Sequence, residues 1–399
     1  MARFPLYAPD FRININGEEM PAVVRSTVTS VRYQDGQNAA DQVTVSLANP
    51  QLRWLQKHIR GLGFQPFPTA VNIGPFRAGS VVPEGTFDID NKFDLYLGYA
   101  PDPPEKMFEG ELTAAEVTFP NGGMPTMTLT AHDFLQRLTR GTAARGFGKL
   151  PDAMIAAILS LEDFLIPAID PAIIAASSGL AAVNFIFGGS GRKQVKRQKG
   201  ETNYELLATI AKSYDADFWV EGDVLYISRF IKEYTPRLTL TYGESLLEFS
   251  PRVTTVGQVA GVSMKFTLRE IPLDFVVSVF WDFDRESLGV SILPGVAAKK
   301  KPKKKDKPLF NIVDKPIKSP ADLAASAPEI VRKLREKLNQ RLTGTGSAIG
   351  DPRIRAGAII ALDGLGPDFS GNYRVKSATH SIDNGGYRTS FEVFKEIIP

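Results

Sequence analysis

The sequence contains no cysteine and only three histidines among its 399 residues. Without cysteine, disulfide bonds, thiolate zinc sites, iron–sulfur clusters and cysteine nucleophiles are excluded. His58, His132 and His380 lie far apart, and none belongs to an H-E-x-x-H zinc motif. The G-x-S-x-G nucleophile motif is absent, and no phosphate-binding glycine motif lies between strand and helix signals. We therefore predict no catalytic, cofactor-binding or metal-binding residues, and no cofactor.

The positive net charge of the chain comes from a single segment. The net charge is +3, yet residues 299–307 (KKKPKKKDK) alone hold seven lysines and one aspartate. The rest of the chain is slightly acidic, so no basic face for nucleic acid is expected. We interpret the lysine run as a solvated loop. Binding to nucleic acid, to an anionic membrane or to a targeting receptor remains the alternative.

Long apolar runs are also scarce. The first ten residues lack the apolar core of a signal peptide, so we expect a cytoplasmic product. Residues 171–191 carry no charge and are long enough to cross a bilayer. They contain a proline, a Ser-Ser-Gly break and an asparagine, and no aromatic belt flanks them. We predict small-residue helices that face the core or a partner, and no membrane span.

Two clusters of carboxylates could in principle bind a metal or perform acid–base chemistry, because alternate residues of a strand share a face. They are Asp88, Asp90 and Asp94, and Asp282, Asp284 and Glu286. Neither cluster has the glycine and distal glutamate of a calcium loop. Solvated strand edges are the favoured interpretation. His132 and His380 each end a predicted strand, in loosely equivalent places, and are expected to be structural hydrogen-bonding groups.

The first third of the chain is rich in strand signals, since apolar and polar residues alternate there. Strands are predicted at 11–15, 23–33, 41–48, 93–99, 108–119 and 124–133, with a long loop at 58–92 and a short helix at 133–139. In the middle, Thr202 and Glu205 form a capping box that starts a helix, and two strands follow at 217–220 and 224–230.

The last third returns to strands. We expect them at 237–242, 253–270, 273–283, 355–362, 371–382 and 387–398. The lysine run and a helix from Pro320 to about Leu342, capped by Ser319, interrupt this series.

One internal similarity organises the whole chain. Residues 108–129 and 369–393 both contain F-x-G, a strand, an NGG turn and a second strand. This order predicts one β-barrel-like unit used twice, although a chance match between two β-meanders is the alternative.

These motifs resemble the hub proteins of contractile injection systems, the late control gene D protein family of contractile-tailed phages, which includes the hub part of type VI secretion spikes. The resemblance rests on PDFRININGEEM, STVTSVRYQD, DQVTVSLANP, FEGELTAAEVTFPNGGMPTMTLTAHDFLQRLTRG, QKGETNYELLATIAKSYDADFWVEGDVLYISR and GDPRIRAGAIIALDGLGPDFSGNYRVKSATHSIDNGGYRTSFEVF. It spans most of the chain but gives little help with 150–200 and with the lysine-rich segment.

The resemblance implies an α+β, mainly β fold with two β-barrel-like, tail-tube-like domains separated by a small α+β domain. We expect them at 1–140, 141–237 with its apolar 150–191 segment, and 238–399 with an insertion at 296–345. It also implies a homotrimer with pseudo-sixfold symmetry. The apolar 150–191 segment is expected to pack between protomers or against a baseplate neighbour.

The function implied is that of a structural, non-enzymatic baseplate hub that joins the sixfold inner tube to a threefold spike. Implied partners are the inner tail tube protein, a spike protein and other baseplate components, in a phage tail or injection particle assembled in the cytoplasm. No repeated spike sequence follows, so a separate spike is expected. The alternatives are a tail-associated cell-wall hydrolase and a cationic nucleic-acid-binding protein. No unassigned stretch is both long enough for a lysozyme-like domain and rich in paired carboxylates.

Overall fold

A computed structural model describes residues 8–37, 39–48, 86–148, 150–186, 197–214, 216–228, 235–253 and 341–395. It also describes the backbone of strands at 261–267, 274–282, 287–294 and 309–311. The predicted loop at 58–92 lies outside these residues up to 85. The lysine run at 299–307 and all but the end of the predicted helix at 320–342 also lie outside them.

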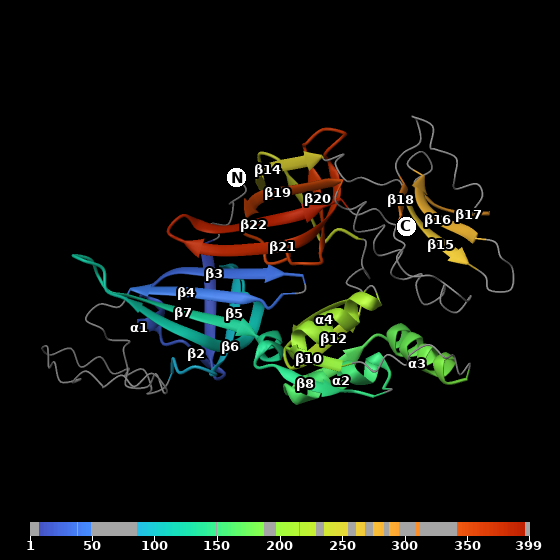
Figure 1. Ribbon diagram of the computed structural model, residues 1–399. Coiled ribbons are helices and arrows are strands. Elements are labelled where there is room, and N and C mark those ends of the chain that lie inside the picture. Colours follow the sequence, from blue (N-terminus) through green and yellow to red (C-terminus); the bar gives the residue numbers. More distant parts are fainter. Residues whose placement is uncertain are drawn as a thin grey trace, which may run out of the picture.

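The fold is mainly β, as the sequence predicts. Its main element is a thirteen-stranded sheet whose central path runs β14-β19-β22-β21-β3-β4-β7-β6-β5-β1-β2, with β20 and β13 branching from β21. Figure 1 shows the upper part of this sheet, from the end of the chain, lying against the lower part from its beginning. Among the described residues the outermost strands β14 and β2 do not pair, so the expected barrel-like units are parts of one open sheet.

The lower part of the sheet holds β1 (Ala8–Ile15), β2 (Glu18–Glu19), β3 (Val28–Gly36), β4 (Gln42–Ala48), β5 (Lys92–Ala100), β6 (Glu105–Thr118) and β7 (Thr126–Asp133). The upper part holds β13 (Leu238–Thr241), β14 (Leu246–Val253), β19 (Leu342–Ile349), β20 (Ile359–Asp363), β21 (Gly371–Asp383) and β22 (Gly386–Phe394).

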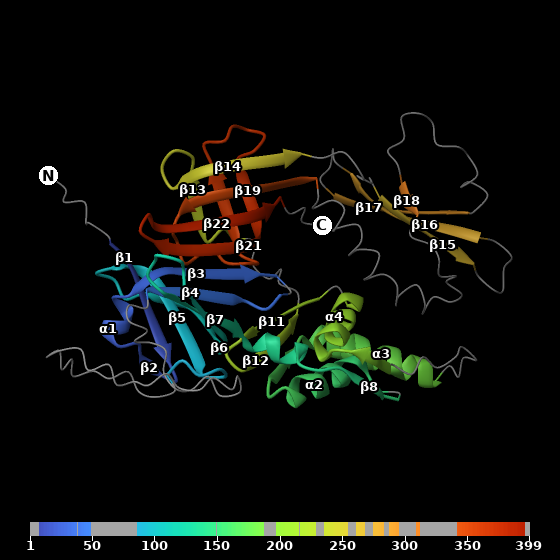
Figure 2. The ribbon, with the colours of Figure 1, turned by 60° about the vertical axis from the view of Figure 1, so that its left-hand side comes forward.

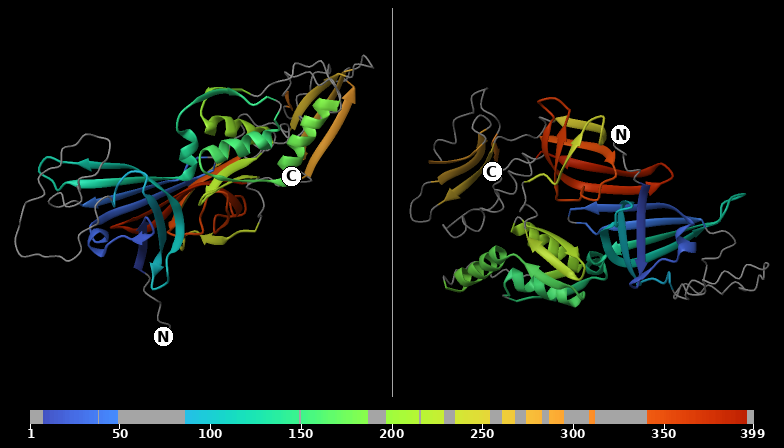
Figure 3. Two further views of the ribbon diagram at one scale, coloured as in Figure 1. Left: turned by 90° about the horizontal axis from the view of Figure 1, so that it is seen from below. Right: turned by 180° about the vertical axis from the view of Figure 1, so that it is seen from behind.

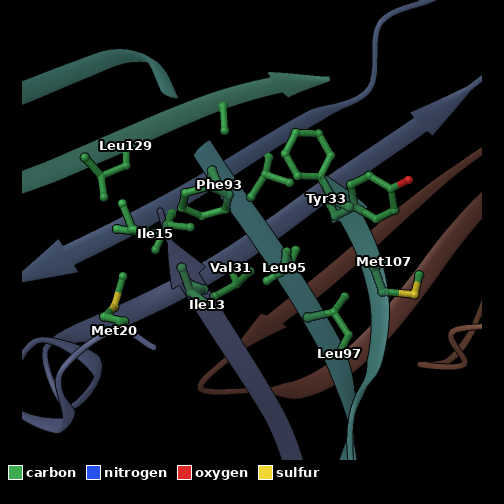
Figure 4. Close-up of a cluster of buried hydrophobic side chains, with 14 of the residues drawn as sticks. Ile13, Ile15, Met20, Val31, Tyr33, Phe93, Leu95, Leu97, Met107 and Leu129 are labelled. Atoms are coloured by element: carbon green, nitrogen blue, oxygen red, sulfur yellow. The ribbon is translucent and has the colours of Figure 1, made fainter. Parts of the chain in front are cut away.

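Alternating burial explains why the lower part curls. In β4 and β7 every second side chain is buried, as expected for strands with one face toward a core. Figure 4 shows β1 and β5 crossing over β3, so that Ile13, Leu95 and Val31 meet between the layers. A separate core lies within the upper part, around Leu246, Tyr373 and Phe391.

The chain from 23 to 33 is not one strand, as the sequence suggested. Ala22–Arg25 forms the short helix α1, and β3 begins only at Val28. Ser26 and Thr27 end the helix, because their hydroxyls donate to the carbonyls of Val23 and Val24 at 2.8 and 2.7 Å. The alternation of apolar and polar residues from 23 to 33 is typical of a strand, so it gave no indication of this single helical turn.

The middle of the chain is a small α+β unit with its own core, shown at the lower right of Figure 1. Its elements are the 3-10 helix η2 (Phe134–Thr139), β8 (Ala143–Gly146), α2 (Asp152–Glu162), β9 (Ile166–Ile169), α3 (Pro171–Ile186), β10 (Arg197–Glu201), α4 (Asn203–Ser213), β11 (Asp217–Glu221) and β12 (Val224–Ser228). The predicted capping box of Thr202 and Glu205 is present at α4. Within the described part of the chain, no helix is both long and apolar enough to cross a bilayer.

A separate four-stranded sheet has the order β17-β16-β15-β18. Its strands are β15 (Gly261–Thr267), β16 (Asp274–Asp282), β17 (Ser287–Pro294) and β18 (Leu309–Asn311). In the views of Figures 1 and 2 it lies to one side of the main sheet.

Three strands of the main sheet were not predicted: β2, β14 except for its last residue, and β19. Residues 342–345, assigned from sequence to the end of an insertion, begin β19, which pairs with both β14 and β22. Its sequence, LTGTGSAI, is rich in glycine, threonine and serine and gives little strand signal. Phe249 explains one glycine, because a Cβ at Gly344 would lie 2.5 Å from its ring.

The upper and lower parts are two copies of one topology. The lower part has the order β3-β4-β7-β6-β5-β1, and the upper part has β14-β19-β22-β21-β20-β13 in the same places. Two residues are called equivalent below when they hold the same place in this pairing scheme. The one departure is that β1 pairs with β5 in antiparallel fashion, whereas β13 and β20 are parallel.

Irregularities in the pairing are repeated too, which favours a duplication over a chance match of two meanders. The bulge at Thr113 of β6 and the bulge at Lys376 of β21 each lie eight residues before the asparagine of an NGG turn. The bulges at Thr29 of β3 and Leu247 of β14 also coincide. The F-x-G similarity is different, since Gly371 pairs with Leu362 in the place where Phe108 pairs with Leu95. That part of the sequence match is not structural.

Candidate functional site

The two repeats are joined along one seam, where β21 pairs with β3 in antiparallel register from Ser377–Gly36 to Ile382–Val31. The right-hand view of Figure 3 shows the red strands of the upper repeat lying beside the blue strands of the lower repeat. The seam is therefore a strand-to-strand contact between two equivalent units, and it is the candidate functional site of the molecule.

His380 and Tyr33 stack across the seam with ring centroids 5.8 Å apart. Nε2 of His380 lies 2.9 Å from the carbonyl of Ile354, which can only accept, so Nε2 donates. Nδ1 then accepts from the hydroxyl of Tyr387 at 2.9 Å or that of Thr389 at 3.0 Å. Burial lowers the pKa of His380 to about 4, which keeps the ring neutral.

Arg355, from the loop between β19 and β20, ties the upper repeat to the lower one. Its Nε donates to Asp35 Oδ2 at 2.8 Å, and Nη2 donates to the Tyr33 hydroxyl at 2.8 Å. The backbone N–H of Ala356 also donates to Asp35, at 3.0 Å. Burial alone would lower the pKa of Arg355, but the hydrogen bond and negative charge of Asp35 and the nearby Asp41 oppose it, and the pKa is raised. The guanidinium is thus a fixed cation that satisfies a buried carboxylate.

Two further carboxyl groups, those of Asp41 and Asp133, adjoin the seam: Asp41 contacts Tyr33, and the N–H of Asp133 donates to the carbonyl of Asp41 at 3.1 Å. The Tyr33 hydroxyl donates to Asp41 Oδ2 at 2.6 Å, and burial raises the pKa of Asp41 well above its usual range. Asp133 caps η2 by accepting from the N–H of Leu135 at 3.1 Å. Burial also raises the pKa of Asp133, to about 7. The network is a rigid joint, because each of these groups is committed to a partner within the fold.

The structure places the two strand histidines differently from each other. His132 lies on β7, the second strand of its hairpin, whereas His380 lies on β21, the first strand of its hairpin. The expectation that they hold equivalent places is therefore wrong. Both are hydrogen bonded, His132 through Nδ1 to the hydroxyl of Thr113 at 2.7 Å and through Nε2 to the amide of Gln42 at 3.1 Å. His58 lies outside the described residues.

The described acidic residues among those singled out in the sequence do not form a metal site. Asp94 pairs with Lys106 at 3.1 Å, and Asp90 pairs with Arg140 at 3.2 Å. Asp88 lies in the turn before β5, and Asp282 ends β16. Asp284 and Glu286 lie outside the described residues. Among the described residues, no group of three or more histidines or carboxylates is arranged to hold a metal ion.

Sequence reasoning missed the seam itself. Asp35 and Arg355 are far apart in the chain, and neither belongs to a recognisable motif. The only usable signal was the duplication, because a repeated sheet needs a place where its two copies meet.

Each repeat also has an outer strand edge, and the two edges are not equally covered. β3 is flanked by β4 and β21, whereas its equivalent β14 has β19 as its one neighbouring strand in the part of the chain that the structure describes. Residues 377–382 of β21 pair with β3 on their outer side. The equivalent part of β6, Ala114–Thr118, has β7 on one side and, among the described residues, no strand on the other.

The fold is shared with solved tail proteins. The 43 kDa tail protein of prophage MuSo2 from Shewanella oneidensis is 12% identical, with a TM-score of 0.59 over 97% of this chain and 98% of that one. A tail protein of Neisseria meningitidis is also 12% identical, with a TM-score of 0.57 over 98% and 97%. This is a phage tail protein fold.

A third solved structure extends the similarity to secretion. The E. coli c3393 protein, described as a component of the type VI secretion system with structural similarity to bacteriophage T4 tail proteins, is 10% identical. Its TM-score is 0.52 over 97% of this chain and 80% of that one. No protein-family model matches the chain, and no curated protein matches its sequence. The structural comparisons thus agree with the resemblance found in the sequence motifs, although no family model or curated sequence matches.

Proposed function

We propose that this chain is a structural hub of a contractile-tail baseplate, in which three copies join a sixfold inner tube to a threefold spike. The observation that carries the proposal is the duplication of one sheet topology, with matching registers and bulges, within a single chain. The tail protein fold supports the same setting.

The duplication solves a symmetry mismatch. Three copies of a chain with two equivalent repeats present six similar sheets, which can face a sixfold tube. The middle α+β unit and the four-stranded sheet occur once per chain, so a trimer presents three of each. One end of such an assembly is pseudo-sixfold and the other is threefold.

The parts of the chain take their roles from this arrangement. Residues 1–140 and 238–399 are the two hub domains, and 141–237 form the domain between them. The partners are the inner tube protein, a separate spike protein and other baseplate components, in a particle assembled in the cytoplasm. Neither a nucleic acid nor a membrane is needed as a partner.

The role is non-enzymatic. The titratable groups of the seam are hydrogen bonded to one another and to the backbone, which is what a joint requires and leaves no free nucleophile or base. Zymography on cell walls tests this directly, and a zone of lysis that follows the protein through purification would make the chain a hydrolase.

Native mass spectrometry tests the trimer. The 43.7 kDa chain, mixed with the tube and spike proteins of its own system, is expected to give a species with three copies of the chain. A chain that stays monomeric with both partners, or that forms a stable hexamer, would contradict the hub assignment.

A further inference from the structure

The seam inside each chain predicts a second seam between chains. β21 and β6 are equivalent, and so are β3 and β14, yet only the pair β21–β3 is made within the chain. β6 and β14 each keep an open outer side among the described residues. An unpaired strand edge is a ready place for another chain to add a strand.

We infer that β6 of one copy pairs with β14 of a second copy of this chain, in the register that joins β21 to β3. This inference rests on the proposed trimer, because the trimer sets the number of copies after which the series of contacts closes into a ring. Carried over residue by residue, the β21–β3 register places Glu116 opposite Arg252 and Thr118 opposite Ser250. The contact is head-to-tail, and three copies close it into a ring of six repeats.

The side chains on the core-facing row of this contact match in character. The equivalents in β21 are Ala378, His380 and Ile382, all of which are buried. On the proposed contact all three opposed pairs are apolar: Ala115–Val253, Val117–Pro251 and Phe119–Phe249. Phe119 and Val253 are 62% and 57% exposed in the single chain, although both side chains are large and apolar. Pairing would bury both.

The side chains on the opposite row match in polarity. Glu116 and Arg252 carry opposite charges, and both are exposed in the single chain. Thr118 and Ser250 can hydrogen bond to each other. Directly opposed pairs of opposite charge and of hydroxyl residues stabilise antiparallel strands. A register shifted by one residue would place Glu116 opposite Pro251 and lose the charge pair.

The backbone is compatible with the same register. In the internal seam the N–H of Gln37 donates to the carbonyl of Lys376 at 3.2 Å, which makes alternate pairs along β3 hydrogen-bonded pairs. On the proposed contact the hydrogen-bonded pairs are Ala115–Val253 and Val117–Pro251. Pro251 contributes its carbonyl but no N–H, so this ladder has one bond fewer than the internal seam. The residue of β3 equivalent to Pro251 is Tyr33, which has a backbone N–H.

A disulfide test is clean because the chain has no cysteine of its own. Thr118→Cys and Ser250→Cys are introduced into one chain, at a non-hydrogen-bonded pair where opposed side chains approach most closely. The hub is assembled with its tube and spike partners, oxidised, and run on a non-reducing gel beside native mass spectrometry. We expect covalent dimers and trimers that revert to single chains on reduction.

The matched control moves one cysteine along the same face. Thr118→Cys with Glu248→Cys keeps both thiols exposed but separates the Cα atoms diagonally by about 7–8 Å, beyond easy bridging. It should remain uncrosslinked. A native trimer without crosslinks in the Thr118–Ser250 variant overturns the proposed contact and leaves the hub function standing. A chain that never forms a trimer overturns both.

Charge reversal supplies a second readout that needs no oxidation. Glu116→Arg is expected to shift the trimer toward single chains in native mass spectra, with unchanged unfolding of the isolated chain because the residue is exposed. Adding Arg252→Glu should restore the trimer by recreating the pair with reversed sign. A double variant that stays as dissociated as the single variant would contradict the pairing.

Discussion

β3 and β14 hold the same place in the two repeats, yet the second halves of the two strands differ in burial. In β3 the core-facing residues Val31, Tyr33 and Asp35 are buried: Val31 and Tyr33 lie in the core of the lower repeat, and Arg355 donates hydrogen bonds to Tyr33 and Asp35. In β14 the residues from Ser250 to Val253 are all exposed. The strands share a register and a bulge, so the difference is one of neighbours and not of fold. A covered edge and an open edge of the same design indicate where the next copy belongs.

The largest effect on stability is expected from the covered side, at His380. Its folded pKa of about 4 lies below the usual 6.5, so the unfolded chain binds the proton more tightly. Stability should be full above about pH 6.5 and fall by about 3 kcal/mol as the pH drops toward 4, at 1.36 kcal/mol per pKa unit.

His380→Gln should remove this part of the pH dependence, measured as the difference in urea unfolding between the two proteins. The two proteins must be compared because Asp133, whose pKa is raised to about 7, has the opposite effect. Its contribution to the unfolding free energy falls as the pH rises from about 4 to 7, in both proteins alike. His132→Gln is the comparison: burial also lowers the pKa of His132, but this side chain is less buried than His380, so the slope should change less. Identical profiles for the wild type and His380→Gln would mean that the ring titrates freely.

The next effect concerns the ion pair that closes the seam. Arg355→Ala leaves the buried Asp35 without its cation and should cost about 2 kcal/mol. This is below the range for fully buried pairs, because the side chain of Arg355 is 30% exposed. Arg252→Ala, on the open edge, is the control and should change the unfolding free energy of the single chain by less than about 0.5 kcal/mol. Equal losses in both variants would remove the distinction between a covered and an open edge.

A smaller effect on the single chain is expected at the open edge itself. Val253→Lys adds a charge to an edge strand, a device that prevents strand pairing. The unfolding free energy of the isolated chain should stay within about 0.5 kcal/mol of the wild type, while trimer formation with the tube and spike proteins should be lost. Normal trimer formation would show that β14 faces solvent in the assembly.

The smallest effect concerns the apolar segment of the middle unit, where Met154, Leu161 and Phe164 are exposed. These side chains are part of the exposed apolar surface of the 150–191 segment, and we expect a protomer or a baseplate neighbour to cover them. Met154→Ser with Leu161→Ser should barely change the unfolding of the isolated chain. In the assembled particle the wild-type α2 should become protected from hydrogen exchange, and unchanged exchange there would contradict the prediction.

Local patterns made most of the strands predictable. Alternation in β4, β7 and β22 and the capping box of α4 each depend on neighbouring residues, so the sequence alone reveals them. β19 was not predicted because glycine, serine and threonine carry little strand signal. α1 was not predicted because a single helical turn of four residues is too short to interrupt the alternating pattern around it. The seam could not be predicted, since Asp35 and Arg355 come together only through the pairing of β3 with β21.

Hydrogen–deuterium exchange tests the central claim most directly, by comparing equivalent strands in the isolated chain and in the trimer. The amides of β21 from Ala378 to Ile382 should be protected in both states, because β3 covers them within each chain. The amides of Ala115, Val117 and Val253 should exchange quickly in the isolated chain and slowly in the trimer. Fast exchange at all three in a confirmed trimer would show that the second copy does not continue the sheet.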